Sequence, residues 1–120
     1  MDFKYYIEEI GVGSINFMME PNEQTVGYIH NVGGWLRCDV QGCGEDYLPK
    51  VKKVLEGEVE EEEFWGNAYK VVVHKDLTKI SYDYEEDNPK MVHCTLPTEM
   101  LYEILEIWIK AYEEHQNKQN

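Results

Sequence analysis

The sequence predicts a single α+β domain spanning residues 1–120, built from an antiparallel sheet of five to six strands, a short central helix and a long C-terminal helix. Three observations favour this fold class. Most segments alternate apolar and polar residues with the two-residue period of strands, whereas one C-terminal segment has the 3.6-residue period of a helix. The chain has 120 residues, 42% of them apolar, which is enough for one hydrophobic core, and no internal repeat or linker divides it.

The N-terminal half is predicted to form an antiparallel meander. Residues 2–10 fit either a helix or a strand, and their Tyr-Tyr-Ile content favours the strand. Residues 14–20, 25–30 and 35–40 are the next predicted strands, separated by turns at Pro21 and at the paired glycines. The expected apolar faces are Ile15, Phe17 and Met19 in the second strand, and Leu36, Cys38 and Val40 in the fourth.

The central helix is predicted over residues 47–55. Asp46 is placed to cap its N-terminus, and Gly57 stands where a glycine commonly ends a helix. The residues expected to form its buried stripe are Leu48, Val51, Val54 and Leu55.

A β-hairpin is predicted from residues 68–74 and 79–84, with residues 75–78 as a four-residue loop. This loop length pairs His74 with Lys79. The residues expected on the apolar face of the hairpin are Tyr69, Val71, Val73, Ile80, Tyr82 and Tyr84.

Two acidic runs flank the predicted hairpin. In the predicted register, both runs leave the sheet at the open end of the hairpin. We therefore expect them to meet in space although they are far apart in the sequence. The first run comprises Glu56, Glu58 and Glu60 to Glu63, and the second comprises Asp83 and Glu85 to Asp87.

The C-terminal third is predicted to contain one strand and the long helix. Residues 90–96 alternate as a strand, and residues 97–114 have the helical period, with Pro97 suited to the first turn. Residues 115–120 are expected to be a frayed polar tail. The predicted inward side chains are Val92, Cys94 and Leu96 in the strand, and Leu101, Ile104, Leu105, Trp108, Ala111 and Tyr112 in the helix.

The net charge of −13 is the most unusual property of the composition. A polyanion is repelled by nucleic acid and by anionic membranes, so the charge disfavours both and favours a cationic protein partner. No apolar run approaches 18 residues, and the N-terminus lacks the basic start and apolar core of a secretory signal. With three cysteines in no disulfide-like spacing, we expect a reduced, cytoplasmic protein.

Metal, cofactor and catalytic motifs are not evident in the sequence. Cys38 and Cys43 are five residues apart, and the adjacent His93 and Cys94 would point to opposite faces of a strand, so neither pair suggests a zinc site. We expect Cys38 and Cys94 to be buried and His93 and Cys43 to be exposed. The sequence contains no calcium-binding loop and no phosphate-binding glycine motif.

The sequence does not favour a cysteine nucleophile. Cys43 paired with His30 or His74 would require a third, orienting group, which the sequence does not supply. Solvated glutamate runs likewise lack the enclosed pair of carboxyl groups that glycoside hydrolysis requires. We therefore expect a protein that is not an enzyme and that uses no cofactor or metal.

The acidic runs have two interpretations. Runs of like charge are commonly solvated loops that keep a protein soluble. Aromatic residues within a charged surface, however, are typical of protein interfaces, and Trp65 beside Gly66 is the best such candidate, whereas Phe64, Tyr82 and Tyr84 also suit a core. The residues predicted to bind a partner are Glu60, Glu61, Glu62, Glu63, Trp65, Asp83, Glu85, Glu86 and Asp87.

Two segments carry a resemblance to a known class of proteins: Gly-Glu-Val-Glu-Glu-Glu-Glu-Phe-Trp-Gly-Asn-Ala-Tyr-Lys-Val-Val-Val at residues 57–73, and Cys-Thr-Leu-Pro-Thr-Glu-Met-Leu-Tyr-Glu-Ile-Leu-Glu-Ile-Trp at residues 94–108. In general layout, the C-terminal half resembles the immunity proteins of bacterial polymorphic toxin and contact-dependent growth inhibition systems. This resemblance implies that the protein binds and neutralises one cognate cationic toxin domain, often a nuclease.

Two alternative functions stay open at the level of the sequence. One is a general acidic interaction or regulatory module with a different basic partner. The other is a small-ligand-binding domain, or an enzyme, that uses Trp35, Arg37, His30 or Cys43 on a concave face of the sheet.

Overall fold

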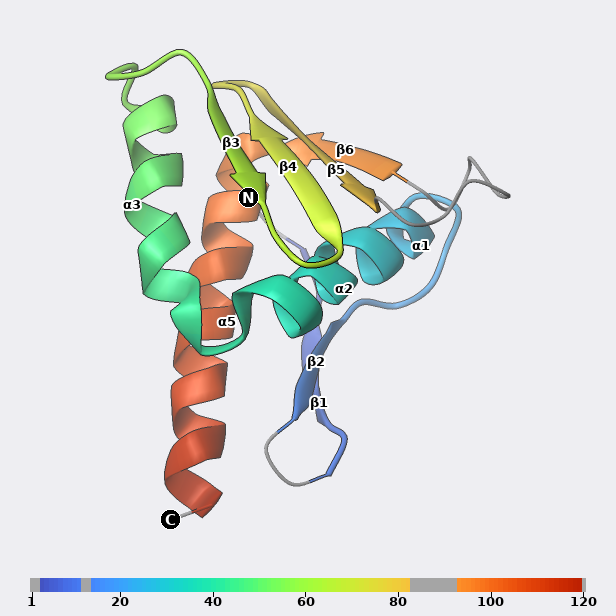
Figure 1. The fold of residues 1–120 in the computed structure, drawn as a ribbon. Helices are drawn as coiled ribbons and strands as arrows, with labels where there is room; N and C mark the ends of the chain where they lie inside the picture. The colour runs from blue at the N-terminus through green and yellow to red at the C-terminus, as the bar shows by residue number, and fades with distance from the viewer. Residues whose placement is uncertain (1–2, 12–13, 83–92, 120) are drawn as a thin grey trace.

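Two antiparallel sheets and a pair of long helices make up the computed structural model, which describes residues 3–11, 14–82 and 93–119 (Figure 1). The smaller sheet pairs β1 with β2, and the larger sheet has the strand order β3-β4-β5-β6. The strands are β1 (Tyr6–Glu9), β2 (Ile15–Met18), β3 (Glu62–Trp65), β4 (Tyr69–Val73), β5 (Leu77–Tyr82) and β6 (His93–Pro97). The predicted α+β fold class is confirmed, although the described strands form sheets of two and four rather than one sheet.

The two long helices are α3 (Gly44–Leu55) and α5 (Thr98–Gln119). They pack against each other, and α5 also covers the inner face of the four-stranded sheet (Figure 1). Their close approach depends on Gly44, because a Cβ at this position would lie 2.5 Å from Cγ1 of Ile109. The side chains of α5 that are buried in this core include Leu101, Ile104, Leu105 and Trp108, as the helical period predicted.

The central helix is confirmed and begins three residues earlier than predicted. It ends at Leu55, and Gly57, just beyond the C-cap Glu56, has a φ of 79°, in the left-handed region that glycine tolerates best. The amide of Gly57 donates to the carbonyl of Val54 at 3.1 Å, and the amide of Glu58 donates to the carbonyl of Lys53 at 2.9 Å. This pair of hydrogen bonds is the Schellman arrangement that satisfies the last carbonyl groups of a helix.

Residues 25–43, between β2 and α3, form a helical segment, so the strands predicted at residues 25–30 and 35–40 are wrong. It consists of short, irregular turns: α1 (Thr25–Gly27), η1 (Tyr28–Val32), α2 (Gly33–Trp35), η2 (Leu36–Val40) and η3 (Gln41–Cys43).

The burial pattern of this segment explains the error. The fully buried residues Val32, Leu36 and Val40 are spaced by four, which suits the wide π-type turns of η1 and η2. A spacing of four also satisfies the two-residue period of a strand, so Leu36 and Val40 fit both structures. Cys38, predicted to be buried with them, is exposed on the opposite side.

The predicted hairpin is confirmed as β4 and β5. Its loop is two residues shorter than expected, which shifts the strand register by two residues. Val73 lies opposite Thr78, and the amide of His74 donates to the carbonyl of Leu77 at 3.0 Å, which closes a tight turn at Lys75 and Asp76. A shift of two residues keeps every side chain on its predicted face. The buried side chains of the two strands are Tyr69, Val71, Val73, Thr78 and Ile80.

The predictions for the two ends of the chain have different outcomes. Residues 6–9 and 15–18 form the β1–β2 hairpin, as predicted, with Ile15 and Phe17 buried. The predicted frayed tail is wrong, because α5 continues to Gln119 and His115 is only 3% exposed. The burial of His115 could not be predicted from the sequence, because the last turn of α5 is otherwise polar.

Asp39 joins the helical segment to the large sheet. Its carboxylate accepts hydrogen bonds from the amides of Asn67 at 2.9 Å, Ala68 at 3.1 Å and Tyr69 at 2.9 Å. Gly66 leaves room for this carboxylate, because a Cβ there would lie 2.3 Å from Oδ2 of Asp39. The β3–β4 turn is therefore held by a side chain from the preceding helical segment.

Candidate functional site

The first acidic run enters the sheet at the end opposite to the predicted one. Residues 62–65 form β3, an edge strand antiparallel to β4, in which Glu62 lies opposite Val73 and Trp65 lies opposite Lys70. Glu62 is therefore beside the β4–β5 turn, whereas β5 ends with Tyr82 at the other end of the sheet. The expectation that this run leaves at the open end of the hairpin is wrong, because the chain first adds a strand that the sequence analysis did not predict.

The second acidic run lies outside the described residues. It contains four of the predicted partner-binding residues, namely Asp83, Glu85, Glu86 and Asp87. Tyr84 lies outside the described residues as well. The other predicted residues, Glu60, Glu61, Glu62, Glu63 and Trp65, are together on β3 and the chain that enters it.

Glu61, in the chain that enters β3, and Glu63 of β3 each contact a basic side chain. Oε1 of Glu61 lies 2.9 Å from Nε2 of His74, and Oε1 of Glu63 lies 3.2 Å from Nζ of Lys70. Both contacts are open to solvent, where such pairs contribute about 0 to 1 kcal/mol. They are therefore weak enough to be exchanged for the cationic groups of a partner.

Trp65 is the most exposed large apolar side chain among the described residues, at 65%. Nζ of Lys70 lies 4.4 Å from the centre of its ring, a cation–π contact on the outer face of the sheet. Its neighbour Phe64 points inward and packs between Trp35 and Tyr47, with ring centres 6.3 Å and 5.0 Å away. Alternation along β3 thus separates the exposed Trp65 from the core residue Phe64, as the interface interpretation requires.

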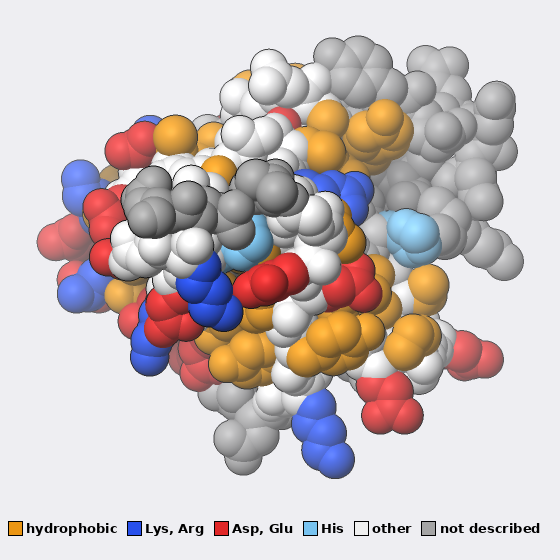
Figure 2. Space-filling view, turned by 90° about the horizontal axis from the view of Figure 1, so that it is seen from below, with side chains coloured by type: hydrophobic (Ala, Val, Ile, Leu, Met, Phe, Trp, Pro, Cys, Tyr) orange, Lys and Arg blue, Asp and Glu red, His pale blue; other side chains and the backbone are white. Residues whose placement is uncertain are grey.

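The face of the molecule shown in Figure 2 carries side chains of both charges. On this face, apolar side chains reach the surface between acidic and basic ones, and the acidic side chains do not form one continuous patch. The outer face of the four-stranded sheet also carries Lys70 and Lys79. Sequence reasoning treated the acidic runs alone and missed these lysines, although their alternation with the buried valines and Ile80 predicts that they face outward.

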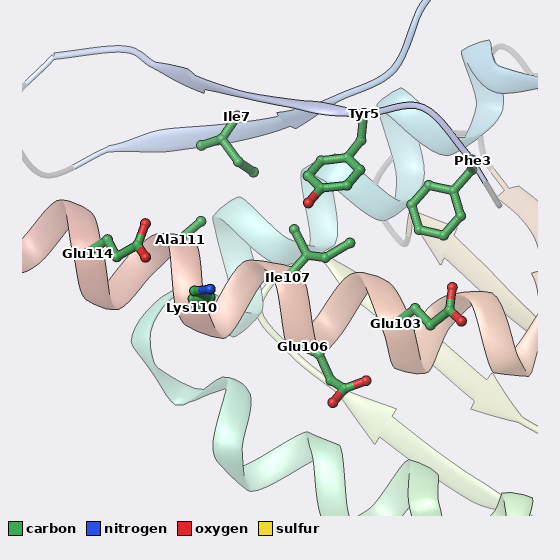
Figure 3. A pocket seen from close by; sticks show the side chains of 9 residues that line it. All are labelled: Phe3, Tyr5, Ile7, Glu103, Glu106, Ile107, Lys110, Ala111 and Glu114. Atoms are coloured by element: carbon green, nitrogen blue, oxygen red, sulfur yellow. The ribbon is translucent and has the colours of Figure 1, made fainter. Parts of the chain in front are cut away.

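A groove lies between β1, with the residues preceding it, and α5. Its volume is about 710 Å³. Apolar side chains from the two elements face each other across it, and charged side chains of α5 line its flank (Figure 3). The lining residues are Phe3, Tyr5, Ile7, Glu103, Glu106, Ile107, Lys110, Ala111 and Glu114.

The four residues predicted for ligand binding do not all line one pocket. Trp35 is 1% exposed and belongs to the core. His30 and Arg37 line a hollow of about 290 Å³ beside β2, which neither Trp35 nor Cys43 lines. These positions lie on the helical segment and not on a concave sheet face.

The cysteines and histidines are dispersed. Cys43 and His93 are exposed and Cys94 is buried, as predicted, whereas Cys38 is exposed. Burial raises the pKa of the Cys94 thiol to about 12, which keeps it protonated at neutral pH. Within the described residues, no group of three or more His, Cys, Asp or Glu side chains is arranged to hold a metal ion.

None of the helices in the described part of the chain has the length and apolar character required to cross a membrane. Comparisons of the chain with protein-family models, with curated proteins and with solved structures gave no match.

Proposed function

We propose that this protein is a non-enzymatic immunity protein, which binds and neutralises a cognate cationic toxin domain, such as a nuclease, through the acidic edge strand β3. The observation that carries this proposal is the placement of Glu60 to Glu63 and the exposed Trp65 on one edge strand and its entry. An apolar anchor beside several carboxylates is the composition expected of a surface that binds a basic protein.

The physical basis of neutralisation is competition with a polyanionic substrate. A nuclease lines its cleft with Lys and Arg to hold the phosphate backbone. Carboxylates placed over this cleft, or beside it, exclude the substrate by charge and by volume. Opposite fields also accelerate the encounter, to about 10⁸ M⁻¹s⁻¹ at low salt, and this rate falls as salt screens the charges.

The contacts of Glu61 and Glu63 are compatible with this role. Glu61 and Glu63 contact His74 and Lys70 in the free protein, at exposed positions where the pairs are weak. A partner that supplies arginines in a better geometry can replace these contacts at small cost. Glu60, which is exposed, has no ion pair with any residue that the structure describes.

The test measures association with the product of the neighbouring gene by calorimetry. A variant with Glu60 to Glu63 changed to Gln should bind at least tenfold more weakly and with a smaller salt dependence. The matched control changes four exposed glutamates elsewhere, Glu8, Glu20, Glu23 and Glu113, to Gln and removes the same charge. Equal weakening in both variants would exclude a specific role of β3.

Trp65 provides a second measurement in the same experiment. Trp65→Ala should weaken binding by about 2 kcal/mol if the indole anchors the interface, whereas its high exposure predicts an unchanged thermal midpoint. A neighbouring gene that encodes no toxin, together with binding to a different basic protein, would instead favour a general acidic interaction module.

A further inference from the structure

We propose that the groove between β1 and α5 binds a basic amphipathic helix of a partner protein. This inference rests on the proposed function only for the identity of that protein. The groove contains no residue of β3, so the two surfaces can be tested independently.

The floor of the groove is an apolar surface that the fold leaves uncovered. Phe3, Tyr5 and Ile7 alternate along one side, and Tyr5 is 45% exposed although its ring stacks on Phe17 at a centre-to-centre distance of 5.5 Å. Ile107 and Ala111 face them from α5, as Figure 3 shows. Apolar side chains from two elements thus converge on a space that no described side chain fills.

The shape of the helical side favours a helix as the occupant. Ile107 and Ala111 are four residues apart and form a ridge along α5, and the small side chain of Ala111 allows a second backbone to approach closely. The lining residues of α5 extend from Glu103 to Glu114, which at 1.5 Å per residue corresponds to roughly 17 Å, or about three helical turns.

The charge of the rim determines the kind of helix. Glu103, Glu106 and Glu114 line the groove against a single cation, Lys110. Glu106 and Glu114 are exposed, and no described cation forms an ion pair with either. A helix with an apolar stripe and flanking Lys or Arg residues would bury the stripe on the floor and place its cations against these carboxylates.

The experiment uses a synthetic fluorescent peptide of about 14 residues, with Leu at the spacing of one helical face and Lys elsewhere. A second peptide has the same composition with the Leu residues scattered, and a third replaces Lys by Glu. Fluorescence anisotropy would measure the binding of each peptide to the full chain. Only the basic amphipathic peptide should bind, and it should gain helical circular dichroism on binding.

Charge reversal of the rim provides the decisive variants. Glu106→Lys with Glu114→Lys should weaken binding of the amphipathic peptide at least tenfold, because two attractions become repulsions. The control, Glu23→Lys with Glu113→Lys, changes the net charge equally at exposed positions outside the groove and should alter affinity less than threefold. Equal losses in the two variants would overturn the proposal, as would equal binding of the scattered peptide.

Methyl NMR locates the peptide without any substitution. Shift changes should be largest for the methyl groups of Ile7, Ile107 and Ala111. Changes centred elsewhere, or a bound peptide in an extended conformation, would overturn the proposal. Because this assay does not use the natural partner, its success or failure is separate from the effect of the β3 variants on partner binding.

Discussion

Asp39 is the side chain that most directly ties the helical segment to the sheet. It accepts hydrogen bonds from the amides of Asn67, Ala68 and Tyr69, which are 28 to 30 residues later in the chain. In Asp39→Asn, the amide group would present a donor to at least one of these N–H groups and remove the charge that strengthens the bonds. We expect a loss of about 2 kcal/mol in the free energy of unfolding, measured by urea denaturation.

Asp76→Asn is the matched control for this substitution. It makes the same change in charge at an exposed position in the β4–β5 turn, where the side chain has no hydrogen bond with a described residue. Its stability should stay within about 0.5 kcal/mol of the wild type. Comparable losses in the two variants would mean that net charge, and not the hydrogen bonds of Asp39, sets the effect.

At the scale of elements, sequence patterns succeeded where one period dominated. The apolar stripe of α5 is compatible only with a helix, and the alternation of β4 and β5 only with strands; all three elements are confirmed. The prediction for the segment before α3 was wrong because Leu36 and Val40 fit both the helical and the strand period, and no local residue excludes π-type turns. β3 was missed because Glu62 and Glu63 have low strand propensity, so its pairing with β4 depends on tertiary context.

The last turn of α5 shows an interaction between elements that no local pattern predicts. Oε1 of Glu9, at the end of β1, lies 3.3 Å from Nζ of Lys118 and 3.5 Å from Nδ1 of His115. The hydrogen bond and charge of Lys118, followed by His115, lower the pKa of the Glu9 carboxyl. A lowered pKa stabilises the folded state above the ordinary range of a carboxyl group, and this contribution is lost as the pH falls through the folded-state pKa.

Lys118→Gln tests this contact between β1 and α5. The pKa of Glu9, measured by NMR titration of its side-chain carbonyl, should rise, because the substitution removes the positive charge of Lys118. Lys53→Gln, which removes an exposed charge from the last turn of α3, should leave it unchanged. An equal rise in both variants would point to the overall field of the protein instead of a local contact.

At the scale of the whole molecule, the candidate site was predictable in composition but not in position. The sequence identified the acidic run and Trp65, and the structure places Glu62, Glu63 and Trp65 on β3. It did not predict which end of the sheet they occupy, because that depends on β3 folding back onto β4. The groove was also missed, because its two sides are about 100 residues apart and only tertiary packing brings them together.

The net charge of −13 itself limits the stability of the folded state, because compaction brings like charges together. Raising NaCl from about 10 mM to about 300 mM shortens the screening length from roughly 30 Å to below 8 Å. At neutral pH, we expect this change to raise the thermal midpoint by roughly 4 °C, as a gain of about 1 kcal/mol would do. Near the sequence pI of about 4.6, where net charge vanishes, the same salt should change the midpoint much less. An equal rise at both pH values would show that a general salt effect, and not relief of repulsion, is responsible. The carboxylates thus have two opposite effects that salt distinguishes. They repel one another in the free protein, so salt stabilises it, and they attract a basic partner, so the same salt weakens binding.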